Sequence, residues 1–350
     1  MDINFPNKET MDKLVLTATA AALLSGSKGL LAMDESTATC NKRFAALGIP
    51  QTEQFRRDWR ELIATTPGLG EYISGAILYD ETLYQNGKDG TPVLQTIINA
   101  GIIPGIKVDA GAKPLAGFPG EKITEGLDGL RERLNGYYKM GLRFAKWRAV
   151  IAIGNGIPTA ACIEANADAL ARYAALCQEA GLVPVVEPEV LMEGTHELQV
   201  CFRVTERMMR AVFTRLYLQG VLLEGIIIKP NMVNPGLTCP VQNTIEEVAD
   251  ATVQCLLQSV PAAVAGIAFL SGGQSGELAT AHLNAMHIRY RSKLPWPLTF
   301  SFARAIQQPA MGIWQGQEKN KRAAQQALLH RAGCDAAARS GEYTAAMEKA

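Results

Sequence analysis

Short hydrophobic runs recur roughly every 30 to 40 residues along this chain of 350 residues. Segments with helical periodicity separate these runs, and several of the segments end at glycine or proline. This alternation is typical of repeated βα units and not of a β-sandwich or a helical bundle. The runs lie at residues 30–33, 73–79, 102–108, 144–153, 182–190, 222–229, 265–271 and 298–303.

Eight strand and helix pairs predict an α/β fold, a single (β/α)₈ TIM barrel. An open doubly wound sheet is the alternative, but it does not usually need eight such units in even succession. Residues 8–25 are expected to form a helical extension ahead of the first strand. We assign residues 1–340 to the barrel domain and expect residues 341–350 to form a short flexible C-terminal tail.

Charge and cysteine content narrow the range of partners. Lys plus Arg and Asp plus Glu both number 34, so no net field attracts nucleic acid or an anionic membrane. The seven cysteines lack CxxC spacing, as expected for reduced thiols in a cytosolic chain. No run approaches the roughly 18 apolar residues of a membrane span, and the N-terminus does not resemble a signal peptide. We therefore expect a cytoplasmic protein without nucleic-acid or membrane partners.

Ionisable or hydroxyl side chains stand at the predicted carboxyl ends of most strands, where barrel enzymes place their chemistry. One such residue alone would more simply be a buried ion pair or a lysine reaching solvent. Several together favour an anionic ligand and acid–base chemistry, because buried charges are costly unless paired. These residues are Asp34, Lys107, Lys146, Arg148, Glu187, Glu189, Lys229, Ser271 and Arg304.

Lys229 has the clearest position of these residues. It follows three β-branched residues, Ile226 to Ile228, and precedes Pro230. The isoleucines favour a strand and the proline disfavours helical geometry at Lys229, so the lysine is expected at a strand's carboxyl end.

Two clusters of residues predict phosphate binding. The stretch FLSGGQSGE places Gly272 and Gly273 between a strand and a helix, where backbone N–H groups can approach a phosphate. Arg304 follows the next strand, so both lie at the usual phosphate site of a barrel. Lys42 and Lys107 would hold a second phosphate across the mouth, which points to a doubly phosphorylated substrate.

Histidine spacing does not favour metal chemistry. His282 and His287 are five residues apart in a helical stretch and do not share a face, while His196 and His330 are isolated. We therefore expect no metal and no cofactor at the site, and the convergent lysines favour covalent amine catalysis.

Several segments, read together, resemble the class I fructose-bisphosphate aldolases over nearly the whole chain. Among them are SKGLLAMDEST, GAILYDETLYQ, FAKWRAV, EGIIIKPNMVNPG, GIAFLSGGQSGE and LTFSFARAIQQPA. The resemblance implies a homotetrameric (β/α)₈ enzyme that cleaves fructose 1,6-bisphosphate to dihydroxyacetone phosphate and glyceraldehyde 3-phosphate without a metal. Sedoheptulose 1,7-bisphosphate would be a second substrate, and the pathway would be glycolysis, gluconeogenesis or the Calvin cycle.

The resemblance also implies residue roles. Lys229 would form the Schiff base, Glu187 would be the general acid and base, and Asp34, Lys146 and Glu189 would assist. The two phosphates and the sugar hydroxyls would be bound by two sets of residues. The ketone-side phosphate would contact Ser271, Gly272, Gly273 and Arg304, and the remainder of the substrate would contact Ser36, Thr39, Lys42, Lys107 and Arg148.

Three positions depart from the family pattern. Family members commonly end in a tyrosine, whereas this chain ends in Ala350, and alanines at positions 38 and 303 replace usual glycines. Two alternatives stay open beside the aldolase. A transaldolase-like or deoxyribose-phosphate-type Schiff-base enzyme would need one strong phosphate site, and a catalytically silent barrel would act as a binding scaffold.

Overall fold

The computed structural model describes residues 8–349, with side chains from residue 12 onward. Eight parallel strands close into a barrel in the order β1-β10-β9-β8-β7-β6-β3-β2, which confirms the predicted (β/α)₈ fold. The barrel strands are β1 (Gly29–Met33), β2 (Ile73–Leu78), β3 (Ile103–Lys107), β6 (Phe144–Ile151), β7 (Val183–Val190), β8 (Ile227–Ile228), β9 (Gly266–Phe269) and β10 (Leu298–Phe302).

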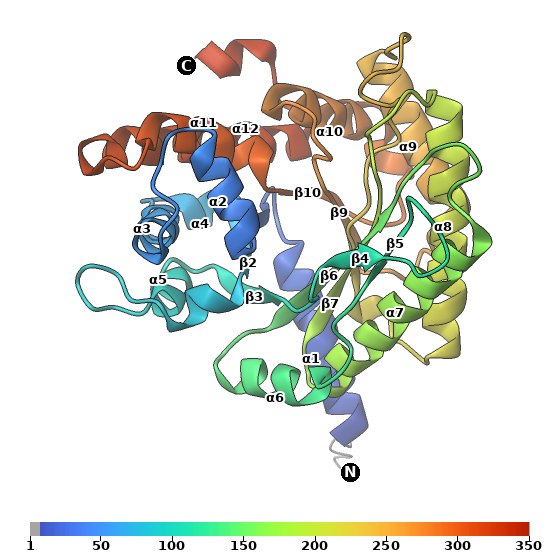
Figure 1. Cartoon of the computed structure of the whole chain (residues 1–350), viewed down its shortest axis with the longest axis horizontal. Coiled ribbons are helices and arrows are strands. Elements are labelled where there is room, and N and C mark those ends of the chain that lie inside the picture. The colour runs from blue at the N-terminus through green and yellow to red at the C-terminus, as the bar shows by residue number, and fades with distance from the viewer. Residues whose placement is uncertain (1–7, 350) are drawn as a thin grey trace, which may run out of the picture.

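Helices surround the barrel, with α7, α8 and α9 on one side and α3, α11 and α12 on the other (Figure 1). Among the described residues, no helix is long and apolar enough to cross a membrane. The α-helices are α1 (Lys8–Leu23), α2 (Thr37–Ala45), α3 (Glu53–Ala64), α4 (Leu69–Tyr72), α5 (Val93–Asn99), α6 (Leu130–Lys139), α7 (Ala160–Glu179), α8 (Leu198–Leu218), α9 (Ile245–Ser259), α10 (Gly276–Tyr290), α11 (Arg304–Trp314) and α12 (Lys321–Ser340).

Shorter elements join these strands and helices. A pair of antiparallel strands, β4 and β5, follows β3, and short 3₁₀ helices occur in several loops. Their bounds are β4 (Ala112–Pro114), β5 (Lys122–Thr124), η1 (Asp80–Tyr84), η2 (Leu223–Gly225), η3 (Arg291–Lys293), η4 (Glu318–Asn320) and η5 (Ala345–Lys349).

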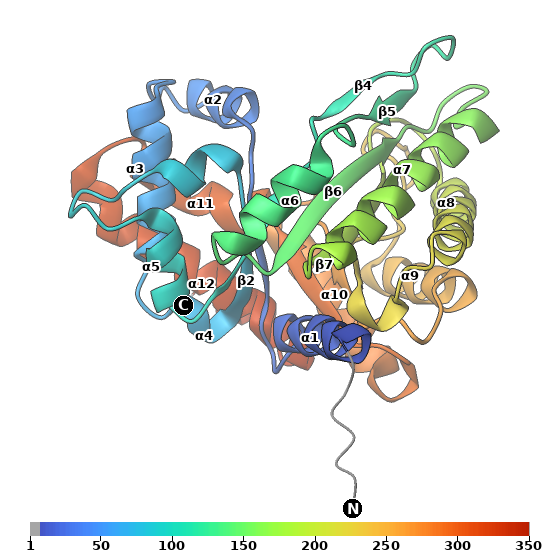
Figure 2. The same ribbon diagram turned by 90° about the horizontal axis from the view of Figure 1, so that it is seen from below.

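The N-terminal helix α1 closes the end of the barrel where the strands begin. Leu16 and Leu23 of α1 are buried in one cluster with Leu30, Phe144 and Ile227, which lie early in their strands. Figure 2 shows α1 at one end of the molecule and the β4–β5 pair beyond the opposite end of β6. Because hydrophobic side chains fill the closed end, polar side chains at the carboxyl ends can face a cleft there.

The expected strand at residues 222–229 is wrong in its first half. Residues Leu223–Gly225 form the 3₁₀ helix η2, and only Ile227 and Ile228 pair as β8. The amide side chain of Gln178 on α7 donates to Leu222 O at 2.8 Å and accepts from Leu222 N at 2.9 Å. These hydrogen bonds satisfy the backbone N–H and C=O of Leu222 without a neighbouring strand.

Residues 341–349 contact the body of the protein. Tyr343 exchanges hydrogen bonds with Asn284 of α10, its N–H donating at 3.1 Å and its C=O accepting at 3.2 Å. Glu348 forms an ion pair with Arg331 of α12 at 2.5 Å. The flexibility of this segment stays a prediction, but the described residues are placed by specific side chains.

Candidate active site

All fourteen residues that the sequence analysis proposed for catalysis and substrate binding line one cleft of about 650 Å³. The cleft lies at the carboxyl ends of the barrel strands, and residues from β1, β3, β6, β7, β8, β9 and β10, or from the loops directly after them, face it. Parallel strands bring their carboxyl ends to one edge, so residues distant in sequence meet there.

Strand register sets the centre of the cleft. Arg148 pairs with Glu187 across β6 and β7, and Val186 pairs with Ile228 across β7 and β8. The N–H of Lys229 continues this alignment by donating to Val186 O at 2.8 Å. Because side chains alternate between the two faces of a strand, Lys146, Arg148, Glu187 and Glu189 all point to the inside of the barrel.

Four buried charges form a connected cluster at this centre. Lys229 Nζ lies 3.0 Å from one oxygen of Glu187, and Lys146 Nζ lies 2.7 Å from the other. Lys146 Nζ also donates to Asp34 Oδ2 at 3.1 Å. Lys229 is only 3% exposed, and the other three side chains are buried as well. Two cations and two anions balance one another, which makes their burial tolerable.

These contacts shift the ionisation of the acidic groups. Burial by itself would raise the pKa of Asp34, but the charges of Lys146, Lys229 and Lys107 lower it well below its usual range. The same balance lowers the pKa of Glu187, with Lys146 and then Lys229 as the principal causes. The pKa of Lys146 is raised, because its attraction to Asp34 and Glu187 outweighs burial. At neutral pH the cluster therefore holds two carboxylates against a permanent ammonium at Lys146.

One end of the cleft has the features of an anion site. Gly272 and Gly273 have φ values of +60° and +99°, which glycine adopts without strain. They lead into α10, whose N-cap Ser275 accepts from Leu278 N. A side chain at Gly273 would approach the guanidinium of Arg304, so the backbone and this cation lie against one another. Backbone amides, a helix N-terminus and an arginine together favour a phosphate.

The opposite end is formed by the loop after β1 and by α2. Ser36 is the N-cap of α2, where its hydroxyl accepts from Thr39 N at 3.4 Å and donates to Thr39 Oγ1 at 3.2 Å. Lys42 lies on the same helix and lines the cleft. This second cationic end gives the cleft room for an anionic group at each side of the central lysines.

Paired charges line the wall between the two ends. The guanidinium of Arg148 donates to Glu189, and its backbone N–H donates to Asp109 at 3.3 Å. Lys107 Nζ lies 3.6 Å from Asp109. Burial alone would lower the pKa of Arg148, but Glu189, Glu187 and Asp109 raise it, so this side chain stays a cation.

Sequence reasoning missed a residue that holds the loop after β1. Glu35 is buried, pairs with Arg43 at 2.5 Å and Arg60 at 3.3 Å, and accepts from Gln307 Nε2 at 2.8 Å. Gln307 also donates to Ala32 O at 2.6 Å. Glu35 thereby anchors the segment that carries the cleft-lining Asp34 and Ser36. Its partners lie on α2, α3 and α11, so only the folded chain reveals the network.

The fold and cleft together set a buried lysine against a carboxylate at the centre of a (β/α)₈ barrel, with Arg304 at one end of the cleft and Lys42 at the other. The model of the family described as fructose-bisphosphate aldolase class-I matches residues 15–350. The chain belongs to the class I fructose-bisphosphate aldolase family.

Individual relatives agree with this assignment. The chain is 56% identical to the probable fructose-bisphosphate aldolase class 1 of Xanthomonas campestris, over 94% of this chain and 98% of the relative. It is 50% identical to the cytosolic fructose-bisphosphate aldolase 6 of Arabidopsis thaliana, over 94% and 91%. The structure superposes with a TM-score of 0.94 and 44% identity on fructose-bisphosphate aldolase from Plasmodium falciparum, covering 98% and 99% of the two chains, in a crystal structure with TRAP and a small-molecule inhibitor.

Proposed function

We propose that this chain catalyses the reversible cleavage of fructose 1,6-bisphosphate to dihydroxyacetone phosphate and glyceraldehyde 3-phosphate through a Schiff base on Lys229. The observation that carries this proposal is the position of Lys229, buried at the end of β8 and 3.0 Å from Glu187. A lysine nucleophile requires a neutral amine and a nearby group that can accept and return protons. Glu187 is that group, and Lys146 is its second partner.

In the first half of the reaction, Lys229 attacks the ketone carbon of the substrate and forms a carbinolamine. Glu187 takes the proton that the Lys229 amine gives up on attack and passes it to the hydroxyl, which leaves as water and yields a protonated iminium. The pKa of Glu187 is held low by Lys146 and Lys229. Because Lys229 is neutral in the carbinolamine, one of these cations is lost and Glu187 becomes a stronger base that can carry the proton.

The iminium then serves as the electron sink for bond cleavage. A base removes the C4 hydroxyl proton, the C3–C4 bond breaks, and its electron pair moves to the iminium nitrogen to give an enamine. We assign this step to Glu187, with Asp34 assisting, and Lys146 contacts both carboxylates. Lys146 stabilises the negative charge that develops during both steps, since a fixed buried ammonium needs no reorganisation. Glyceraldehyde 3-phosphate leaves, and protonation and hydrolysis of the enamine release dihydroxyacetone phosphate.

The two ends of the cleft bind the two phosphates. Ser271, Gly272, Gly273 and Arg304 hold the phosphate on the ketone side, while Ser36, Thr39, Lys42, Lys107 and Arg148 hold the other phosphate and the hydroxyls. Glu189 keeps Arg148 in position through their ion pair. Sedoheptulose 1,7-bisphosphate presents the same ketone and terminal phosphates, so it is proposed as a second substrate.

The relatives support proposals for location and assembly. A cytosolic plant relative supports a cytoplasmic site of action, and a chloroplastic rice relative of 47% identity fits a carbon-fixation role. The family resemblance supports a homotetramer. Sedimentation velocity at micromolar concentration tests it: a fourfold chain mass is expected, and a single-chain mass refutes the assembly.

Cleavage kinetics test the function itself. Dihydroxyacetone phosphate release from fructose 1,6-bisphosphate is measured with EDTA present, using wild type, Lys229→Met and Lys113→Met as an exposed control. Turnover is expected in wild type and the control and is expected to be lost in Lys229→Met. The same assay on fructose 1-phosphate separates the alternatives, because a large loss of kcat/KM indicates a second phosphate site. Equal rates on both sugars would favour a transaldolase-like enzyme, and no turnover would favour a scaffold.

A further inference from the structure

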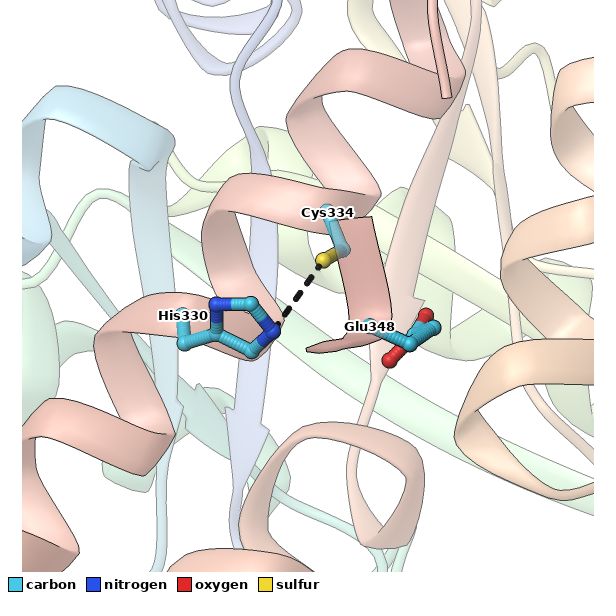
Figure 3. A group of neighbouring side chains, drawn as sticks. All are labelled: His330, Cys334 and Glu348. Atoms are coloured by element: carbon cyan, nitrogen blue, oxygen red, sulfur yellow. Dashed lines mark hydrogen bonds between the residues drawn. The ribbon is translucent and has the colours of Figure 1, made fainter. Parts of the chain in front are cut away.

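A histidine, a cysteine and a glutamate meet outside the cleft, where the C-terminal segment folds back on α12. The ligand-type atoms of His330, Cys334 and Glu348 all lie within 4.8 Å of one another. Figure 3 shows the imidazole of His330 facing the sulfur of Cys334, with the carboxylate of Glu348 beside them. The aldolase chemistry proposed above uses none of these side chains.

The helix places two of these groups together. His330 and Cys334 are four residues apart on α12, a spacing that puts both side chains on one face. His330 Nε2 and Cys334 Sγ are 3.7 Å apart. Around tetrahedral Zn²⁺, with bonds of ~2.0–2.3 Å, neighbouring donor atoms lie about 3.3–3.8 Å from each other. The His–Cys pair therefore already has the separation of two zinc ligands.

The carboxylate of Glu348, the third group, has a lone pair left for a metal. Both oxygens of Glu348 accept from Arg331 at 2.5 Å, and one of them also accepts from the Tyr343 hydroxyl at 2.7 Å. A carboxylate has about four lone-pair positions, so one remains after these three contacts. A movement of about 1 Å would bring this oxygen to the donor spacing of a zinc site. Arg331 and Tyr343 act as the outer groups that orient a metal-binding carboxylate.

Acidic side chains gather beside these three groups. Arg331 is in contact with two of them, Glu348 at 2.5 Å and the fully buried Asp335 at 3.5 Å. Asp335 Oδ2 has no hydrogen-bond partner among the described residues. Binding of a divalent metal would release the proton of the Cys334 thiol to solvent.

We propose that His330, Cys334 and Glu348 bind one Zn²⁺ ion per chain, with solvent as the fourth ligand, and that the ion fastens residues 345–349 to α12. The donor set of one nitrogen, one sulfur and one oxygen suits zinc better than the oxygen-seeking Mg²⁺ or Ca²⁺. The site is structural and separate from aldol cleavage. From the sequence we expected no metal, because no pair of histidines has the spacing of metal ligands. Glu348 joins His330 and Cys334 only when the C-terminal segment is folded.

Cobalt substitution tests the site directly. Chelator-treated full-length protein is titrated with Co²⁺, which replaces Zn²⁺ and gives a thiolate charge-transfer band in the near ultraviolet when a cysteine binds it. One equivalent per chain is expected, and Zn²⁺ should displace it. Cys334→Ser should abolish the band, whereas Cys239→Ser, a buried cysteine in a loop elsewhere, should retain it. Absence of the band in wild type, or its persistence in Cys334→Ser, would overturn the proposal.

Two further variants keep the test valid if Cys334→Ser folds poorly. His330→Ala changes a half-buried side chain and should remove one ligand, and Tyr343→Phe should weaken Co²⁺ affinity by about 10–100-fold through loss of an outer hydrogen bond. Unchanged affinity in His330→Ala would overturn the site. Cleavage of fructose 1,6-bisphosphate serves as the fold control, and it should be equal with and without Co²⁺. A failed metal titration therefore leaves the aldolase proposal untouched.

Discussion

Replacing Lys146 by methionine removes the cation that joins the two acidic groups of the cleft. The ammonium lies 2.7 Å from Glu187 and 3.1 Å from Asp34. At an effective dielectric constant of ~20, unit charges ~3 Å apart attract by about 5–6 kcal/mol before the cost of burial is counted. Loss of this fixed charge should lower kcat for cleavage by about 10²–10³-fold. The release of dihydroxyacetone phosphate from fructose 1,6-bisphosphate measures this change in kcat.

The Lys146→Met substitution should also change how kcat/KM depends on pH. Burial raises the pKa of Glu187 and Asp34, and Lys146 is the largest contribution that lowers both. Without it, both carboxyls protonate at a higher pH. This moves the acid limb of the kcat/KM profile to higher pH.

The loss of stability caused by Lys146→Met should also depend on pH. Carboxyls with lowered folded pKa values stabilise the fold above their ordinary values of 3.8 and 4.5, and this contribution is lost as the pH falls through the folded values. Removing one partner of a buried ion pair costs about 3–5 kcal/mol. In urea unfolding, the variant should therefore be less stable at pH 7, with a smaller deficit near pH 4.

Lys146→Arg, which keeps the charge, should retain more activity than Lys146→Met. Glu81→Gln, which removes a carboxylate paired with Arg56 outside the cleft, controls for loss of an ion pair as such. A Lys146→Met enzyme within threefold of wild-type kcat, or an acid limb displaced to lower pH, would refute the reasoning.

Three further predictions concern other parts of the molecule. Arg304→Ala should raise KM for fructose 1,6-bisphosphate by about 10–100-fold, because a hydrogen bond to a charged group contributes about 1.5–3 kcal/mol; an unchanged KM contradicts its phosphate role. Glu35→Ala should destabilise the fold by about 3–5 kcal/mol, since Arg60 is left buried without its carboxylate; urea midpoints equal to wild type would exclude this. In Gly29→Ala the new Cβ would lie 2.5 Å from the Phe300 ring, which should cost about 1–3 kcal/mol and lower Tm, whereas an unchanged Tm would show that the ring moves freely.

The barrel was predictable because each strand carries its own signal. The run Ile226 to Ile228 and the following Pro230 place Lys229 at a strand end without any tertiary information. The end of pairing before Ile227 was not predictable, since the peptide groups of Leu222 bond to Gln178 of α7, 44 residues earlier in the chain. Local periodicity identifies which segments pair, but long-range side-chain contacts set where the pairing begins.

The residues that line the cleft could be predicted from the ends of the strands. The side chains that support the cleft from behind could not. Lys229 directly follows β8 and Glu187 lies within β7, so the parallel pairing of Val186 with Ile228 brings the two side by side. Glu35 depends on Gln307, which lies 272 residues later in the chain, and no local pattern links them. The His330 and Cys334 spacing is visible in the sequence, but the position of Glu348 depends on the packing of the tail.

Borohydride trapping tests the central claim most directly. Wild-type protein is incubated with dihydroxyacetone phosphate and EDTA, reduced with borohydride, and analysed by intact mass and peptide mapping beside a known Schiff-base aldolase. One stable adduct per chain on Lys229, absent from Lys229→Met, is the predicted result. An unmodified chain, or an adduct on another lysine while the known aldolase is labelled normally, would contradict the account.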